Sequence, residues 1–168
     1  MPQIELSTSK GLVQKTGTGV DVQSTGLEGV LVSSETSLPT AIGNTDIQFS
    51  MPAGALVTDF GFVVTSAVGG GGNGGTMTVD LGTSAGGAQL VATAVVADAD
   101  STIAAGSSMS VLNAVKADAS GAAFGDFKDA SVLHSSSART LTARFAQGAG
   151  AAAAIGKVFA YIKYTVIA

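Results

Sequence analysis

Few residues of this sequence have side chains that could carry out chemistry. The 168 residues include one histidine, His134, and no cysteine, so thiol catalysis, cysteine-ligated zinc and multi-histidine metal sites are excluded. His134 precedes three serines at 135–137, which places a base next to hydroxyl groups. A nucleophilic serine is usually held on a strained turn of the type G-x-S-x-G, and none of these three lies in one. We therefore expect His134 to be an ordinary polar residue at the end of a strand.

The carboxylates are also poorly placed for a metal ion. Asp98 and Asp100, followed by Thr102, resemble the start of a calcium-binding loop, because alternate acidic residues surround one hard cation. The glycine and the final bidentate glutamate of such a loop are missing, so we expect a solvated turn. Asp126 and Asp129 are expected to lie in a solvated loop as well.

One glycine-rich segment matches a nucleotide-binding pattern without its context. Residues 69–74 satisfy G-x-G-x-x-G, but the strand-like TMTVDL follows where a phosphate-binding helix would be needed. Residues 69–75 are therefore predicted to be a flexible hairpin loop. The sequence thus predicts no catalytic residue, no cofactor and no metal.

Charge and hydropathy limit the partners. The formal net charge is -4 and the pI is near 4.6, and no two basic residues are adjacent, which argues against binding nucleic acid. The longest uncharged stretch, 60–79, is too rich in glycine for the roughly 20 apolar residues of a membrane helix. Glu5 and Lys10 stand where a secretory signal needs its apolar stretch, so we expect synthesis in the cytoplasm without export by that route.

Alanine usage divides the chain. Residues 1–40 contain none of the 28 alanines, and all of them follow residue 40. Residues 1–25 have too few large apolar groups to offset the entropy of ordering, so they are predicted to be an extended arm that lies on another surface. Residues 26–168 are predicted to form one domain of about the usual size. The arm residues expected to make contacts are Ile4, Leu6, Leu12 and Val13.

Alternation of apolar and polar residues is the main signal beyond the arm. It predicts strands at 45–51, 76–81, 139–147 and 157–167, and a first strand at 29–32. Residues 56–65 are apolar on both parities apart from Thr58 and Asp59, which predicts a central strand. The alanine-rich segments 88–99 and 151–154 are poor helices, because the first is rich in β-branched residues and the second is short. The fold predicted is all-β, an antiparallel jelly-roll-like sandwich of seven to nine strands.

The last predicted strand carries two aromatic residues on its outer face. Its even positions from Val158 onward are expected to face the core, which leaves Phe159 and Tyr161 on the other side. They are covered either by a second layer or loop of the same chain, or by another subunit. Lys157 and Lys163 at the two ends give this face the apolar centre and charged rim of a subunit contact.

Two motifs resemble those of a known protein class. Residues 51–59, MPAGALVTD, and residues 78–84, TVDLGTS, resemble elements of the capsid decoration or cement proteins of tailed bacteriophages. In similar virion proteins the first motif opens a jelly-roll strand and the second closes its partner. The resemblance implies a structural protein without catalytic residues, usually a homotrimer, bound to the major capsid protein on the outer surface of the virion.

The sequence-based hypothesis is therefore mechanical. The arm would lie across neighbouring subunits, and many weak contacts repeated by symmetry would hold capsomers together. A phage tail, tail-tube or fibre protein is the alternative. A carbohydrate-binding jelly roll is disfavoured by the lack of tryptophan and by having only two tyrosines, and a cupin-like enzyme by the single histidine.

Overall fold

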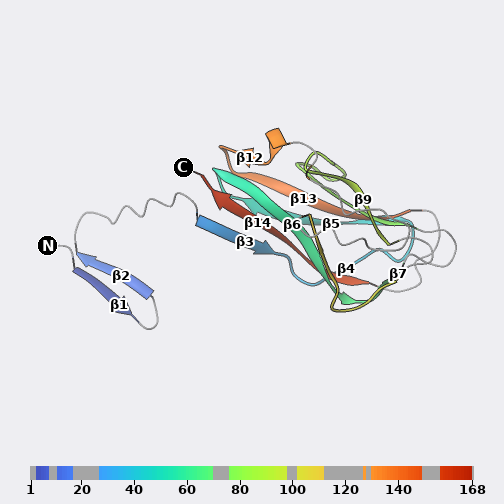
Figure 1. Cartoon of the computed structure of the whole chain (residues 1–168), viewed down its shortest axis with the longest axis horizontal. Helices are drawn as coiled ribbons and strands as arrows, with labels where there is room; N and C mark the ends of the chain where they lie inside the picture. Colours follow the sequence, from blue (N-terminus) through green and yellow to red (C-terminus); the bar gives the residue numbers. More distant parts are fainter. Residues whose placement is uncertain are drawn as a thin grey trace.

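The computed structural model describes residues 3–7, 11–16, 27–69, 76–97, 102–111, 127, 130–148 and 156–167. These residues form antiparallel sheets, two of which pack as a sandwich (Figure 1). The predicted all-β sandwich is thus confirmed. The first sheet has the order β11 (Ser108–Ser110), β6 (Ala55–Ser66), β14 (Lys157–Val166), β3 (Leu27–Val32), with β12 (His134–Ser135) on β6 and β4 (Thr36–Ser37) on β14. The second has the order β5 (Gly43–Met51), β13 (Arg139–Gln147), β8 (Met77–Gly82), β9 (Val91–Ala97).

Smaller elements complete the described part. β7 (Val68–Gly69) pairs with β10 (Thr102–Ile103), and η1 (Ala130–Val132) is a single 3-10 turn. β1 (Gln3–Ser7) pairs with β2 (Gly11–Thr16) as a hairpin that joins neither sheet among the described strands. No α-helix occurs in the described ranges, and hence none long and apolar enough to cross a membrane. The predicted boundary between arm and domain near residue 25 stays a prediction.

The inner faces of the two sheets form the core. On β5 the residues Ile47, Phe49 and Met51 are buried and the residues between them are exposed, as predicted. Phe62 of β6 meets Phe145 of β13 edge to face, with ring centroids 5.4 Å apart, so this pair joins the two sheets. The alanine-rich segment forms strand β9, because small and β-branched residues fit between packed sheets. The predicted hairpin loop 69–75 begins at Gly69 of β7, but β7 pairs with β10 and β8 pairs with β13 and β9, so the strands on its two sides do not form a hairpin. Residues 70–75, the segment 151–154 and the four aspartates considered as metal ligands or loop residues lie outside the described residues.

β6 is central in its sheet, as predicted, and a bulge explains why it is apolar on both parities. Val57 pairs with Tyr164 of β14 and Asp59 pairs with Lys163, so Thr58 between them has no partner on β14. The extra residue exchanges the two faces of the strand. Apolar residues at odd positions before the bulge and at even positions after it therefore reach the same core.

The turn at 52–54 leads the chain from the second sheet into the first. Gly54 has φ +74°, which favours glycine, and β6 begins at Ala55, so the first motif does open a strand. The second motif ends β8 at Gly82, but β8 pairs with β13 and β9 and not with β6. The expectation that the second motif closes the partner of the first is therefore wrong, because the turn at 52–54 places β6 in the other sheet.

Candidate interaction surface

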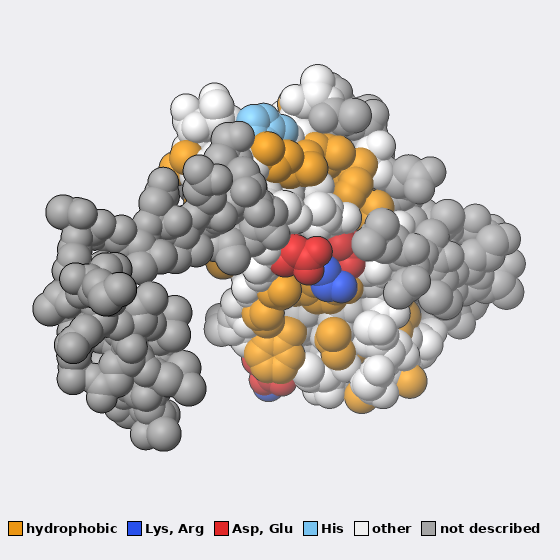
Figure 2. Space-filling view, turned by 60° about the vertical axis from the view of Figure 1, so that its left-hand side comes forward, with side chains coloured by type: hydrophobic (Ala, Val, Ile, Leu, Met, Phe, Trp, Pro, Cys, Tyr) orange, Lys and Arg blue, Asp and Glu red, His pale blue; other side chains and the backbone are white. Residues whose placement is uncertain are grey.

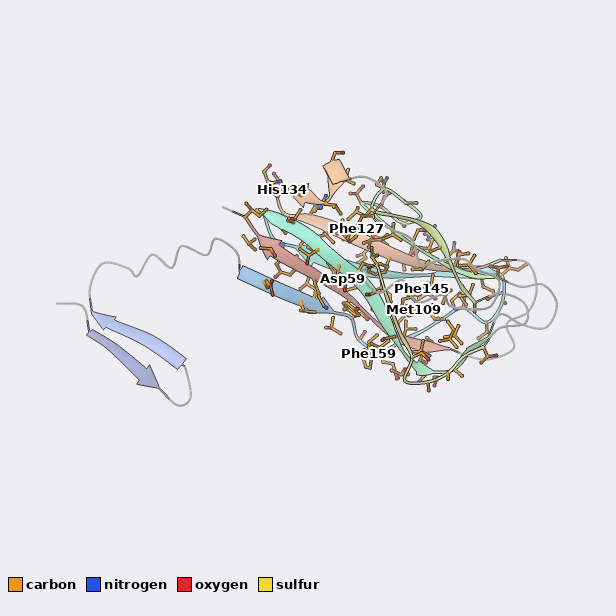
Figure 3. All side chains as sticks on the ribbon, in the orientation of Figure 1. Asp59, Met109, Phe127, His134, Phe145 and Phe159 are labelled. Atoms are coloured by element: carbon orange, nitrogen blue, oxygen red, sulfur yellow. The ribbon has the colours of Figure 1, made fainter. Side chains whose placement is uncertain are left out.

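The structure gives His134 no catalytic setting. It is exposed in β12, opposite Leu56 near the start of β6, whereas Phe159 lies toward the other end (Figure 3). The neighbouring Ser135 hydroxyl donates a hydrogen bond to the Ser137 carbonyl at 2.8 Å, so it serves a local turn. Among the described residues no group of three potential metal ligands occurs.

Sequence reasoning overlooked a serine motif elsewhere. Residues 82–86 read GTSAG and match G-x-S-x-G. They connect β8 to β9, whereas a nucleophile elbow leads from a strand into a helix. The Gly87 amide donates to the Ser84 carbonyl at 2.9 Å, and the Thr83 amide donates to the Gln89 side chain at 3.2 Å. This segment is a structural turn.

The predicted faces of the last strand are confirmed as far as Ile162, whereas Tyr164 and Val166 are only partly buried. Val158, Ala160 and Ile162 are fully buried in the core, and Phe159 and Tyr161 lie on the outer face. Phe159 is 36% exposed, and the neighbouring strand β3 adds two more exposed side chains, Val30 at 56% and Val32 at 62%. These residues line a shallow groove of about 420 Å³, completed by Val63, Tyr161 and Lys163. We call it the outer groove.

Charged side chains accompany hydrophobic ones on this side of the molecule. Figure 2 shows hydrophobic side chains gathered beside acidic and basic groups. At one end of the outer groove Lys157 lies 3.2 Å from Glu35. At the other end the Lys163 ammonium lies 3.6 Å from the buried Asp59 carboxylate and 5.6 Å from the centre of the Tyr161 ring. Both lysines predicted for the rim therefore have a carboxylate partner.

Tyr161 is held by its own sheet more firmly than Phe159 is. It pairs with Gly61 of β6, and its ring lies over that glycine, since a Cβ atom at position 61 would come within 2.6 Å of the tyrosine hydroxyl. The hydroxyl lies 3.5 Å from Asp59. Burial raises the pKa of Tyr161, and the nearby Asp59 carboxylate adds to this shift. Of the two alternatives for these aromatics, cover by the same chain applies in part to Tyr161, whereas Phe159 is more exposed.

A second polar group was not predicted. On the outer face of the second sheet Arg144 lies between Asp46 and Asp80 on the flanking strands. Its guanidinium binds Asp46 through two hydrogen bonds of 2.7 and 2.8 Å, which lowers the pKa of Asp46. Burial raises the pKa of Asp80. The shared solvent-facing parity of the three residues was the available signal, but strand order was needed to bring them together.

The arm residues lie in the hairpin. Its backbone register places Leu6 opposite Leu12 and Glu5 opposite Val13, with Ile4 opposite Gln14. Contact of these residues with a capsid stays a prediction.

Comparisons with known proteins assign no family to this chain. No family model matches the sequence, and no curated protein matches it. A chain described as "Cyanophage Pam1 capsid asymmetric unit" is similar with a TM-score of 0.46 and 16% identity, over 95% of this chain and 96% of that one. A chain of infectious bursal disease virus strain Gx is similar with a TM-score of 0.39 and 13% identity, over 99% of this chain. The present chain covers only 41% of that viral chain.

Proposed function

We propose that this protein is a structural component of a virion, which binds across capsomers on the outer capsid surface and stabilises the shell. Its partners are the major capsid protein and further copies of itself, assembled as a trimer. A phage tail, tail-tube or fibre protein is the alternative, since it would share the small-residue β composition. The proposal draws on the resemblance of residues 51–59 and 78–84 to decoration proteins.

The observation that carries the proposal is the exposed apolar face of the first sheet. Val30, Val32 and Phe159 stand together on adjoining strands and leave apolar area in contact with water. Such a patch with a charged rim is typical of a protein contact surface. Among the described residues Ser135 beside His134 serves a local turn and no group of three potential metal ligands occurs, so adhesion accounts for this face better than catalysis.

Phe159→Asp tests the contact between copies. Its ring is the most open aromatic of the outer groove, and a carboxylate buried there without a partner would cost several kcal/mol, of the order of 3–5. We expect light scattering to show a trimer for the wild type and folded monomers for the variant. Ile42→Asp is the matched control, because Ile42 is 76% exposed and does not line the outer groove. A monomeric wild type would contradict the proposal.

Tyr161→Asp is a poorer test of the same surface. A carboxylate at position 161 would lie near Asp59, so the repulsion would disturb the fold of the chain itself.

Electron microscopy of virions labelled with an antibody against the protein distinguishes the two structural functions. Label over the capsid surface supports decoration, and label confined to the tail supports the alternative.

A further inference from the structure

β3 has one open edge among the described strands. It ends the order of the first sheet, with β14 on one side only. The Ser33 amide donates to the Ala160 carbonyl at 2.9 Å, which makes these two residues a hydrogen-bonded pair. Hydrogen-bonded and non-bonded pairs alternate along an antiparallel ladder. The backbone amide and carbonyl of Leu31 therefore point toward β14, and those of the residues on either side of it point away from β14. The amide and carbonyl groups aimed at the open edge belong to Glu28, Val30 and Val32.

The open edge has little of the usual protection. Edge strands are commonly blunted by charged residues, above all lysine, by proline or by a bulge; β3, LEGVLV, has Glu28 as its one charged residue and no proline, lysine or bulge. Its exposed valines also line the outer groove. The edge strand β5 differs, because its outward residues Asp46, Gln48 and Ser50 are polar. β3 thus offers both unpaired backbone groups and an apolar surface beside them.

The hairpin of β1 and β2 lacks a third strand, and the open edge of β3 lacks a partner strand among the described strands. β1 and β2 pair with each other and with no other described strand. An isolated two-stranded hairpin is at best marginally stable in water, and a third strand is normally required. We propose that β2 of a second copy adds to the open edge of β3 as an antiparallel strand. This inference rests on the proposed assembly of copies and names the strands that join them.

The two strands match in length and in residue type. β2 and β3 have six residues each. In the register that places Lys15 opposite Glu28, Val13 stands opposite Val30 and Leu12 opposite Leu31. Opposite charges and apolar residues that face each other across strands stabilise a sheet. A shift by one residue places Lys15 opposite Gly29 or Leu27 and removes the charge pair.

The length of the connection permits an exchange between copies. Ten residues, 17–26, separate β2 from β3, and an extended chain spans about 3.3 Å or slightly more per residue, so about 35 Å can be bridged. Within one chain β2 is paired with β1 and not with β3. Donation of a strand from each copy to the next is a head-to-tail contact, which closes as a ring under three-fold symmetry.

Cysteine cross-linking tests the inference, because the chain contains no cysteine of its own. Val13→Cys and Val30→Cys chains, produced together and oxidised, should form a covalent dimer containing one chain of each kind. Val13→Cys produced with Ile42→Cys is the control and should form none. An assembled protein without the first cross-link would overturn the inference and leave the proposed function standing, whereas a wild-type monomer would overturn the proposed function.

Charge reversal gives a second, independent measurement. Lys15→Glu or Glu28→Lys should each weaken assembly by roughly tenfold or less, and the double variant should restore most of the loss. If the losses of assembly in the two single variants add up in the double variant, the register that places Lys15 opposite Glu28 is wrong. In a chain that carries both Val13→Cys and Val30→Cys, a disulfide formed within monomers would show that each hairpin binds its own β3.

Discussion

Proline substitutions at two neighbouring positions of β3 distinguish its edge paired with β14 from its open edge. The backbone amide of Leu31 points toward β14. Leu31→Pro therefore removes this amide from the ladder and leaves the carbonyl of the buried Ile162 without its hydrogen-bond donor. Val30 faces the open edge, so Val30→Pro removes an amide that bonds to no strand within the described part of the chain. Proline is tolerated in strands mainly at such outward positions.

The expected costs differ severalfold. For Leu31→Pro, the lost hydrogen bond contributes about 1 kcal/mol and the unsatisfied carbonyl about 1–3 kcal/mol. Loss of the leucine contacts with the core adds about 1 kcal/mol, because Leu31 is only partly buried. The total of about 3–5 kcal/mol is a large share of the 5–15 kcal/mol stability typical of a domain. For Val30→Pro we expect about 1 kcal/mol or less, mainly from the fixed φ angle.

Urea unfolding followed by circular dichroism measures both costs, and light scattering reports the assembly state. Val30→Pro should remain folded yet fail to assemble, and Val30→Ala controls for the loss of the side chain. Equal destabilisation by the two prolines would refute the alternation assigned to β3. A Val30→Pro protein that assembles as well as Val30→Ala would refute the use of this edge.

Two further pairs of variants test residues outside the hydrophobic core. Asp46→Asn should lower the thermal midpoint at pH 7, because the pKa of Asp46 is lowered by Arg144 and its stabilisation, present above the unfolded pKa, is lost as pH falls through the folded value. Asp80→Asn should be neutral or stabilising at pH 7, because its raised pKa means that stability is gained as pH falls; a larger loss than for Asp46→Asn would contradict this assignment. Gly61→Ala should cost about 1–3 kcal/mol in urea unfolding, since the new methyl group meets the Met109 carbonyl oxygen and the Tyr161 ring. Gly106→Ala, with open space around it but φ +88°, should cost about 1 kcal/mol.

Strict alternation made β5, β8, β13 and β14 predictable. In β5 from Ile47 to Met51 and in β14 from Val158 to Ile162 each apolar residue on one parity is buried, because a regular strand with one covered face leaves a period of two in its sequence. The central position of β6 followed from its apolar content. The outward placement of Phe159 was predictable for the same reason.

The rest depended on contacts between distant segments. The bulge at Thr58 is defined only by the partner strand, and the Tyr161 ring occupies space left free by Gly61, a hundred residues earlier in the chain. Asp80 has the solvent-facing parity of its strand but is only 7% exposed, which the alternation of its strand does not predict. The open edge of β3 follows from strand order, which alternation does not encode.

The order of strands also has a consequence during synthesis. β13 and β14 are the central strands that hold β5 to β8 and β3 to β6, and both come after all of those strands in the chain. Neither sheet can therefore close until residues 139–166 have left the ribosome. Until then the edges of β3, β5, β6 and β8 that pair with β13 or β14 remain unpaired, and unpaired edges can associate with other nascent chains. Completion of both sheets is thus a late event, because it requires the last two described strands, β13 and β14.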